Sequence, residues 1–251
     1  MESIKKITLM MIVFFSIFIS KSYANINVGT VVYDPPYVIS TSQGFEIEFI
    51  KLLCSKIKEQ CTFLPMNYYE LFTALNNKKI DIAVDGIDFY ITPNQLNGNY
   101  IYSYPYLLSQ GQFLVLKNSG IKDLSTLPQG AKIGTVQENK QPDQGIFYDY
   151  FMTHYSPKYN LVLFADVESL IAALGTGKIS AAFMDENQSN YWSQNMQGQF
   201  LELVKPFKVA DGIGIMALPS QKKLIQKLNQ QIKIIENSPE YIQLYNTYIS
   251  Q

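Results

Sequence analysis

The chain alternates between short apolar runs and longer segments in which apolar residues recur at helical spacing. The runs at 26–32, 61–64 and 80–84 are rich in β-branched and apolar residues and predict strands. The segments 44–57 and 69–76 lie between them and predict helices. A βαβαβ order of this kind predicts a parallel sheet with helices on both faces.

The same pattern restarts in the second half of the chain. Residues 131–136, 160–164 and 179–184 predict three more strands, and the segments 141–155 and 167–176 predict the helices that connect them. A second sheet of the same type is therefore expected.

We predict an α/β protein of two similar lobes. From Gln221 onward, apolar residues again recur at helical spacing and predict amphipathic helix to the C-terminus. Segments near 109–112 and 209–211 are interpreted as the two crossings between lobes. The predicted boundaries are 1–24 for a leader, 25–109 with 211–251 for the first lobe, and 110–210 for the second.

The carboxyl ends of the predicted strands indicate where a ligand would bind, since open α/β sheets form their sites there. These ends fall at 32–37, 84–90, 136–141 and 184–186. Two lobes that face each other across them enclose a cleft that can close on a small ligand.

The first 24 residues have the pattern of a secretory signal peptide. Lys5 and Lys6 precede the apolar run 7–19, and residues 22–24 (SYA) form a small-x-small cleavage site. Cleavage after Ala24 leaves 251 − 24 = 227 residues in the periplasm, enough for two small domains. An uncleaved membrane anchor is the alternative interpretation.

Composition argues against several classes of function. The chain has 20 lysines, no arginine and a formal net charge of −1, so nucleic acid and anionic membranes are poor partners. His154 is the only histidine, which leaves no conventional zinc site and no Ser-His-Asp triad. We therefore expect no catalytic residue, no metal and no cofactor.

Cys54 and Cys61 are the only cysteines, and an even count in an oxidising compartment indicates a disulfide. Seven positions along one helix would separate the two Cα atoms by about 10 Å, whereas a disulfide needs less than about 7 Å. The helix is therefore predicted to end before Cys61, so that the bridge joins its end to the next strand. Two free buried thiols are the alternative.

Several local motifs match one family in their order and spacing. The motifs are DPPY at 34–37, GFEIE at 44–48, CTF at 61–63, GID at 86–88, AAFMDE at 181–186 and GIGI at 212–215. The CTF motif is preceded by Cys54, seven positions before its own cysteine. Through them the chain resembles the polar amino-acid solute-binding proteins of ABC transporters, especially those for lysine, arginine, ornithine and histidine.

The resemblance implies a Venus-flytrap fold with two strand crossovers, a monomer, and delivery of the ligand to a membrane permease. It implies that Asp185 takes the α-ammonium group of an amino acid and that Tyr68 packs on the ligand's side chain. Asp85, Gly86 and Asp88 would supply main-chain or side-chain acceptors. A loop-capping role is the alternative for Asp85 and Asp88.

The chain departs from the family where the ligand's carboxylate is held. The family has Thr-x-x-Arg, whereas here Thr92 is followed three positions later by Gln95, which has no charge. A threonine position in the second lobe is occupied by Lys140. Our hypothesis is that Lys140, with exposed helix amides, replaces the missing arginine; a solvated surface lysine is the alternative.

Asp34 stands where the family usually has tyrosine, although it too could be a loop cap. With Asp88 and Asp185 it gives the predicted cleft a negative surplus, which suits a cation. The main prediction is therefore capture of a cationic amino acid, without chemistry. The alternatives are a cation that has no carboxylate, such as a polyamine, a repurposed sensor, and a dehydratase on the same fold.

Overall fold

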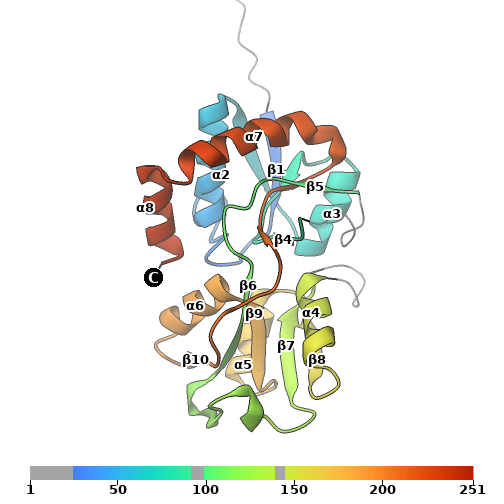
Figure 1. The fold of residues 1–251 in the computed structure, drawn as a ribbon, viewed down its shortest axis with the longest axis vertical. Coiled ribbons are helices and arrows are strands. Elements are labelled where there is room, and N and C mark those ends of the chain that lie inside the picture. The colour runs from blue at the N-terminus through green and yellow to red at the C-terminus, as the bar shows by residue number, and fades with distance from the viewer. Residues whose placement is uncertain (1–24, 92–98, 139–144, 251) are drawn as a thin grey trace, which may run out of the picture.

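The structure consists of two α/β lobes joined by two chain crossovers (Figure 1). The computed structural model describes residues 25–91, 99–138 and 145–250. The upper lobe in Figure 1 contains a five-stranded sheet in the order β2-β1-β3-β13-β5. The lower lobe contains a six-stranded sheet, in which β10-β6-β9-β7-β8 are neighbours and β11 also pairs with β6.

The first sheet combines the N-terminal half of the chain with the returning C-terminal segment. β1 (Asn25–Thr30) pairs in parallel with β2 (Gln60–Pro65) and β3 (Ile82–Ala83). β13 (Met216–Ala217) pairs antiparallel with β3 and with β5 (Ile101–Tyr102). The parallel pairs follow from the predicted βαβ order, because parallel neighbours need a crossover connection that is usually a helix.

Four helices cover this sheet: α2 (Phe45–Ile57), α3 (Tyr68–Asn76), α7 (Lys222–Ile235) and α8 (Pro239–Tyr248). α2 packs against both C-terminal helices, and α7 lies across the top of the lobe in Figure 1. Within the described ranges, no helix combines the length and the apolar character needed to cross a membrane.

The second sheet has a parallel centre and antiparallel additions. β7 pairs in parallel with β8 and β9, whereas β6 runs antiparallel to β9, β10 and β11. The stacked rings of Phe113 and Phe183 lie in its core. Its elements are β6 (Gln110–Leu116), β7 (Lys132–Val136), α4 (Ile146–His154), β8 (Asn160–Phe164), α5 (Val167–Gly175), β9 (Ala181–Asp185), α6 (Glu186–Asn195), β10 (Phe200–Glu202) and β11 (Phe207–Lys208).

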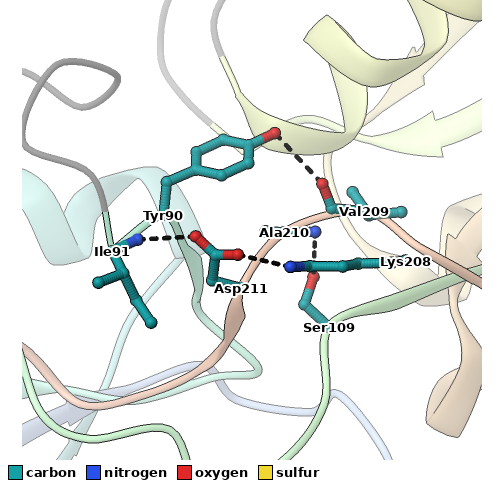
Figure 2. Close-up of polar contacts among 7 residues, drawn as sticks. All are labelled: Tyr90, Ile91, Ser109, Lys208, Val209, Ala210 and Asp211. Carbon is teal, nitrogen blue, oxygen red and sulfur yellow. Dashed lines mark hydrogen bonds and ion pairs between the residues drawn. The ribbon is translucent and has the colours of Figure 1, made fainter.

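The two crossovers run side by side at the predicted segments near 109–112 and 209–211. Ser109 accepts a hydrogen bond from the Ala210 N–H at its hydroxyl, over 2.9 Å (Figure 2). The Asp211 carboxylate accepts from the Ile91 N–H at 2.9 Å and pairs with Lys208 Nζ at 2.6 Å. Just beyond, β4 (Asp88–Phe89) pairs with β12 (Gly212–Ile213). The loop that carries Asp88 is therefore attached directly to the crossover.

Two predictions about helix and strand extent need correction. The C-terminal segment forms α7 and α8 rather than one helix from Gln221, because the Ser238 hydroxyl accepts from the Tyr241 N–H and Pro239 occupies the first helical turn. The strand expected at 80–84 is only β3, Ile82–Ala83. Part of the helix expected at 141–155 lies outside the described residues, and α4 begins at Ile146.

The predicted disulfide is present. α2 ends at Ile57, and Lys58 adopts a left-handed conformation with φ 59° that turns the chain into β2. Cys54 and Cys61 are bonded, with their Cα atoms 6.2 Å apart. The bridge therefore ties the last turn of α2 to the start of β2, as the geometric argument predicts.

Replacing both cysteines by serine is expected to lower the free energy of unfolding by about 2–3 kcal/mol, because the short loop is no longer closed in the unfolded chain. For a chain of this size that corresponds to a melting temperature roughly 5–10 °C lower. Thermal unfolding of the Cys54→Ser/Cys61→Ser variant measures the change. Reductant should lower the melting temperature of the parent protein and leave the variant unchanged; equal melting temperatures would contradict the prediction.

Candidate functional site

A cavity of about 210 Å³ lies between the two lobes and is lined by residues from both. Since a water molecule takes about 30 Å³ of liquid, this space fits a solute the size of an amino acid. Within the described residues, its charged lining is entirely acidic: Asp34, Asp85, Asp88, Glu138, Asp166, Glu168 and Asp185.

Asp34 and Tyr37 connect the first lobe to the second. The Gln188 side-chain amide donates to both carboxylate oxygens of Asp34, at 2.6 and 2.7 Å. The Tyr37 hydroxyl donates to Asp185 Oδ1 and accepts from the Asn187 side-chain amide at 3.0 Å. These hydrogen bonds join the two walls of the cavity beside Asp185.

The loop after β3 brings Asp85, Gly86 and Asp88 to the cavity. The Gly86 N–H donates to the buried Glu46 carboxylate at 2.9 Å. Gly86 has a φ of 58°, and a Cβ at this position would lie 2.5 Å from the Tyr37 ring. A glycine is needed here both for the backbone conformation and for the close approach of Tyr37.

Asp185 ends β9 and caps α6. Its Oδ1 accepts from the Asn187 N–H at 2.8 Å as well as from the Tyr37 hydroxyl. Burial raises the pKa of Asp185 to about 6, although these hydrogen bonds favour the charged form. Hydrogen bonds to Oδ1 thus fix the orientation of the Asp185 side chain.

Three carboxylate oxygens in this cavity have no hydrogen-bond partner among the described residues: Asp85 Oδ1, Asp88 Oδ1 and Asp185 Oδ2. These side chains belong to residues that are only 3%, 8% and 5% exposed. An unpaired buried acceptor costs about 1–3 kcal/mol, and more when it is charged. Asp85, Asp88 and Asp185 therefore line the cavity with one unsatisfied acceptor each, an oxygen that is covered in this structure. A cation with several N–H groups would satisfy these acceptors once the carboxylates turn toward it.

Glu138 follows β7 and occupies the N-terminus of α4. Its carboxylate accepts from the Phe147 N–H at 2.7 Å, and the amides of Ile146 and Tyr148 also favour its charged form. Gly145 has a φ of 145°, and a Cβ there would lie 2.5 Å from Glu138 Oε2. The glycine thus leaves the space that the Glu138 carboxylate takes up.

The structure brings six of the eight predicted ligand-binding residues to one cavity: Asp34, Tyr68, Asp85, Gly86, Asp88 and Asp185. The other two, Gln95 and Lys140, lie outside the described residues. Direct contact of any of the eight with a ligand stays a prediction.

Sequence reasoning missed Tyr37, Glu138 and Gln188 as parts of this site. Gln188 could have been predicted from the sequence, because it lies three positions after Asp185, the N-cap of α6, and therefore in the first turn of the same helix. Glu138 lies in the strand end already predicted at 136–141. Its bond to α4 is not visible in the sequence, because Glu138 and Phe147 are nine positions apart.

The described residues show neither a metal cluster nor a histidine in the cavity. Among them, no group of three or more His, Cys, Asp or Glu side chains is placed to hold a metal ion. His154 is exposed, stacks on the Tyr150 ring and bonds to the Tyr150 carbonyl at 2.8 Å.

Proteins of known name resemble this chain over most of its length. The arginine-binding periplasmic protein of Mannheimia haemolytica is 23% identical over 222 residues, which cover 86% of this chain and 87% of that protein. The ABC transporter arginine-binding protein 1 of Escherichia coli is 26% identical over 211 residues, 83% of this chain and 82% of that protein.

A solved structure has the same fold. The arginine 3rd transport system periplasmic binding protein from Legionella pneumophila superposes with a TM-score of 0.78 at 24% identity, covering 89% of this chain and 99% of that one. The predicted two-lobed periplasmic binding-protein fold is thereby confirmed. The model of bacterial extracellular solute-binding proteins, family 3, matches residues 26–251, and the chain belongs to that family.

Proposed function

We propose that this protein captures a cationic amino acid (arginine, lysine, ornithine or histidine) in the periplasm and delivers it to the permease of an ABC importer. The signal peptide would be removed after Ala24, and the mature chain would act as a monomer without chemistry of its own. The observation that carries this proposal is that Asp85, Asp88 and Asp185 line one cavity and that each has a carboxylate oxygen without a hydrogen-bond partner among the described residues.

Charge selects the ligand class. Burial holds the pKa of Asp85 and of Asp88 well above the usual range, because each carboxylate is desolvated and close to other acids. A cation that enters would offset this repulsion and supply the missing hydrogen-bond donors. An anionic solute such as glutamate would increase the repulsion.

The relatives support the same ligand class. Two of the proteins compared above carry names that describe arginine binding, and the family comprises extracellular solute-binding proteins. In this proposal Asp185 accepts from the α-ammonium group, and Tyr68 packs on the ligand's side chain. Asp34, Asp85, Gly86 and Asp88 surround the remaining N–H groups, and the roles of Gln95 and Lys140 stay predictions.

The described lining does not favour the dehydratase alternative. The substrates of such a dehydratase would be organic acids with one or more carboxylates, and these carboxylates need basic partners. The cavity's described charged residues are all acids, so such a substrate would be repelled. Ultraviolet detection of an aromatic product after adding a prephenate-like acid would contradict the binding-only proposal.

Thermal unfolding against a ligand panel tests the proposal. A ligand at 100 times its dissociation constant stabilises the folded protein by about 2.7 kcal/mol, which raises the melting temperature by roughly 5–10 °C. We expect this shift with one or more of arginine, lysine, ornithine and histidine. Glutamate and aspartate serve as controls and should cause no shift, and a panel without any cationic hit would reject the proposal.

A further inference from the structure

A loop of the first lobe contacts a helix of the second lobe directly. The loop comprises residues 33–37, which come shortly after β1 in the chain, and the helix is α6. In Figure 1, α6 lies on the side of the lower lobe that faces the upper lobe. We call this contact the clasp, and it consists of the loop residues Tyr33, Asp34 and Tyr37 and the helix residues Asn187, Gln188, Tyr191 and Trp192.

The loop is fixed within its own lobe. Asp34 and Val38 exchange two backbone hydrogen bonds, at 2.7 and 2.9 Å, which close the loop. The Pro36 and Tyr37 carbonyls accept from the first two N–H groups of α2, at 2.9 and 3.1 Å. The Tyr37 side chain is fully buried. Because the loop is anchored to α2 in this way, its side chains reach the second lobe in a fixed direction.

The polar half of the clasp lies at the start of α6. Both oxygens of Asp34 accept from the side-chain amide of Gln188, at 2.6 and 2.7 Å. The Tyr37 hydroxyl accepts from the side-chain amide of Asn187 at 3.0 Å. Gln188 lines the cavity together with Asp34 and Tyr37, so these hydrogen bonds cross from one lobe to the other beside the space for the ligand.

The aromatic half of the clasp lies one turn further along α6. Tyr33 shares a side-chain hydrogen bond with Tyr191. Its ring meets the Trp192 ring edge-on, with 6.5 Å between the centroids, and packs on a hydrophobic cluster of the second lobe. Positions 187, 188, 191 and 192 lie on one side of α6, because residues three and four apart are neighbours on a helix. One loop and one helix face thus meet at three loop residues.

Opening of the cleft would break these contacts. A rotation of the lobes about the crossovers near 109–112 and 209–211 would move the loop away from α6. Each contact of the clasp joins two protein side chains directly, so it favours the closed arrangement whichever ligand lies in the cavity. If closure is needed for binding, the apparent dissociation constant falls in proportion to the closed fraction, by the same factor for every ligand.

We propose that the clasp holds the two lobes closed over the cavity and that Asp34 and Gln188 raise affinity through closure. Asp34 is then a positioning residue that acts through Gln188, whereas Asp185 contacts the ligand in the proposed function. The inference rests on the proposed function only where it concerns affinity, because the clasp itself is a contact within the protein.

Replacing Gln188 tests the effect on affinity, measured for arginine, lysine, ornithine and histidine by calorimetry and stopped flow. Gln188→Ala removes both hydrogen bonds to Asp34. The dissociation constants of all those amino acids that bind should rise by the same factor, about tenfold, mostly through faster dissociation. Unchanged affinity, or factors that differ more than about threefold between ligands, would overturn the proposal.

Asn190→Ala is the matched control. Asn190 belongs to α6 but is not among the residues that line the cavity, and it lies two positions from Gln188, on another side of the helix. This variant should bind each amino acid within about twofold of the parent. An equal loss in Asn190→Ala would show that the effect of Gln188→Ala comes from a disturbed helix, and the proposal would be wrong.

Asp34→Asn distinguishes closure from direct contact with the ligand. Asparagine keeps an acceptor for the Gln188 amide but cannot carry a charge. If Asp34 acts through Gln188, Asp34→Asn should bind each amino acid within about threefold of the parent, while Asp34→Ala should lose as much as Gln188→Ala. If Asp34 instead binds the cation itself, Asp34→Asn will lose as much as Asp34→Ala, and the proposal fails.

A double-mutant cycle in the protein without added ligand tests the clasp itself. Urea unfolding compares Asp34→Ala, Gln188→Ala and the double variant with the parent. Because the two side chains contact each other, the loss in the double variant should be smaller than the two single losses combined, by at least about threefold in the unfolding equilibrium constant. Additive losses would overturn the proposal. If none of the four amino acids binds, the proposed function is rejected, and the cycle still decides for or against the clasp.

Discussion

Asp185→Asn is expected to weaken binding of the cationic ligand by about 100-fold, with no loss of stability in the unliganded protein. Removing one partner from a buried charge pair costs about 2–5 kcal/mol. Asp185 is 5% exposed, and one of its oxygens has no partner among the residues that the structure describes. Asparagine preserves the shape of the side chain and can still accept from the Asn187 N–H, so the cap of α6 remains. Titration calorimetry of the best ligand from the panel measures the loss.

The stability of this variant distinguishes a binding role from a structural one. Burial disfavours the charged form of Asp185, so a neutral amide should leave the melting temperature of the unliganded protein unchanged or raise it slightly. Asp123→Asn is the control, because Asp123 is an exposed cap of the turn Leu124–Thr126 and does not line the cavity. Affinity within threefold of the parent for Asp185→Asn would show that this carboxylate does not hold the ligand.

Hydrophobic pattern predicted the two lobes and the parallel strands of each sheet, but not the antiparallel strands that make both sheets mixed. The two occurrences of the strand-helix pattern correspond to the two sheets, and the distance limit on Cys54 and Cys61 correctly required α2 to end before the second cysteine. Hydrophobic periodicity is a local property of the sequence, and it therefore predicted the positions of most helices and strands well. It could not distinguish one C-terminal helix from two, because Ser238 and Pro239 interrupt a segment that stays amphipathic on both sides.

The strand pattern predicted where the site lies, and the family resemblance predicted which residues form it. Asp185 ends β9 and Asp85 follows β3 by two residues, and the carboxyl ends of parallel strands meet at one edge of a sheet. Asp88 begins β4, a short strand that pairs antiparallel with β12. The contacts that decide the chemistry are long-range and were not predictable in this way. Tyr37 meets Asp185 across 148 positions of sequence, and Gln188 meets Asp34 across 154. Their partners depend on how the two lobes face each other, which no local pattern encodes.

The unliganded protein is expected to lose stability as the pH rises from 5 to 8. Burial raises the pKa of Glu46 and of Glu138 to about 7 and that of Asp185 to about 6, whereas unfolded carboxyls titrate near 4. Between these values the folded state binds more protons than the unfolded state, so stability falls as pH increases. Each group contributes about 1–3 kcal/mol over this window, and the melting temperature should fall by at least about 5 °C.

The acids whose pKa is lowered do not reverse this trend. The pKa of Asp123 is lowered mainly by its hydrogen bond with Ser125, and that of Asp211 mainly by its hydrogen bond with Lys208. A lowered pKa in the folded state adds stability that is lost only as the pH falls below about 4. A melting temperature that stays level or rises between pH 5 and pH 8 would therefore contradict the assigned state of the buried acids.

Ligand affinity is expected to change in the opposite direction over the same range. A bound cation favours the charged carboxylates, so binding releases protons and the affinity should rise by roughly 10- to 100-fold from pH 5 to pH 8. Calorimetry in two buffers of different ionisation enthalpy measures the released protons directly. In Asp185→Asn the number of protons released on binding should be smaller by those that Asp185 releases in the parent. Asp123→Asn should release as many protons as the parent. Because Asp185 both weakens the empty protein as the pH rises and binds the cation in this proposal, the stabilisation by ligand should be largest where the unliganded protein is least stable.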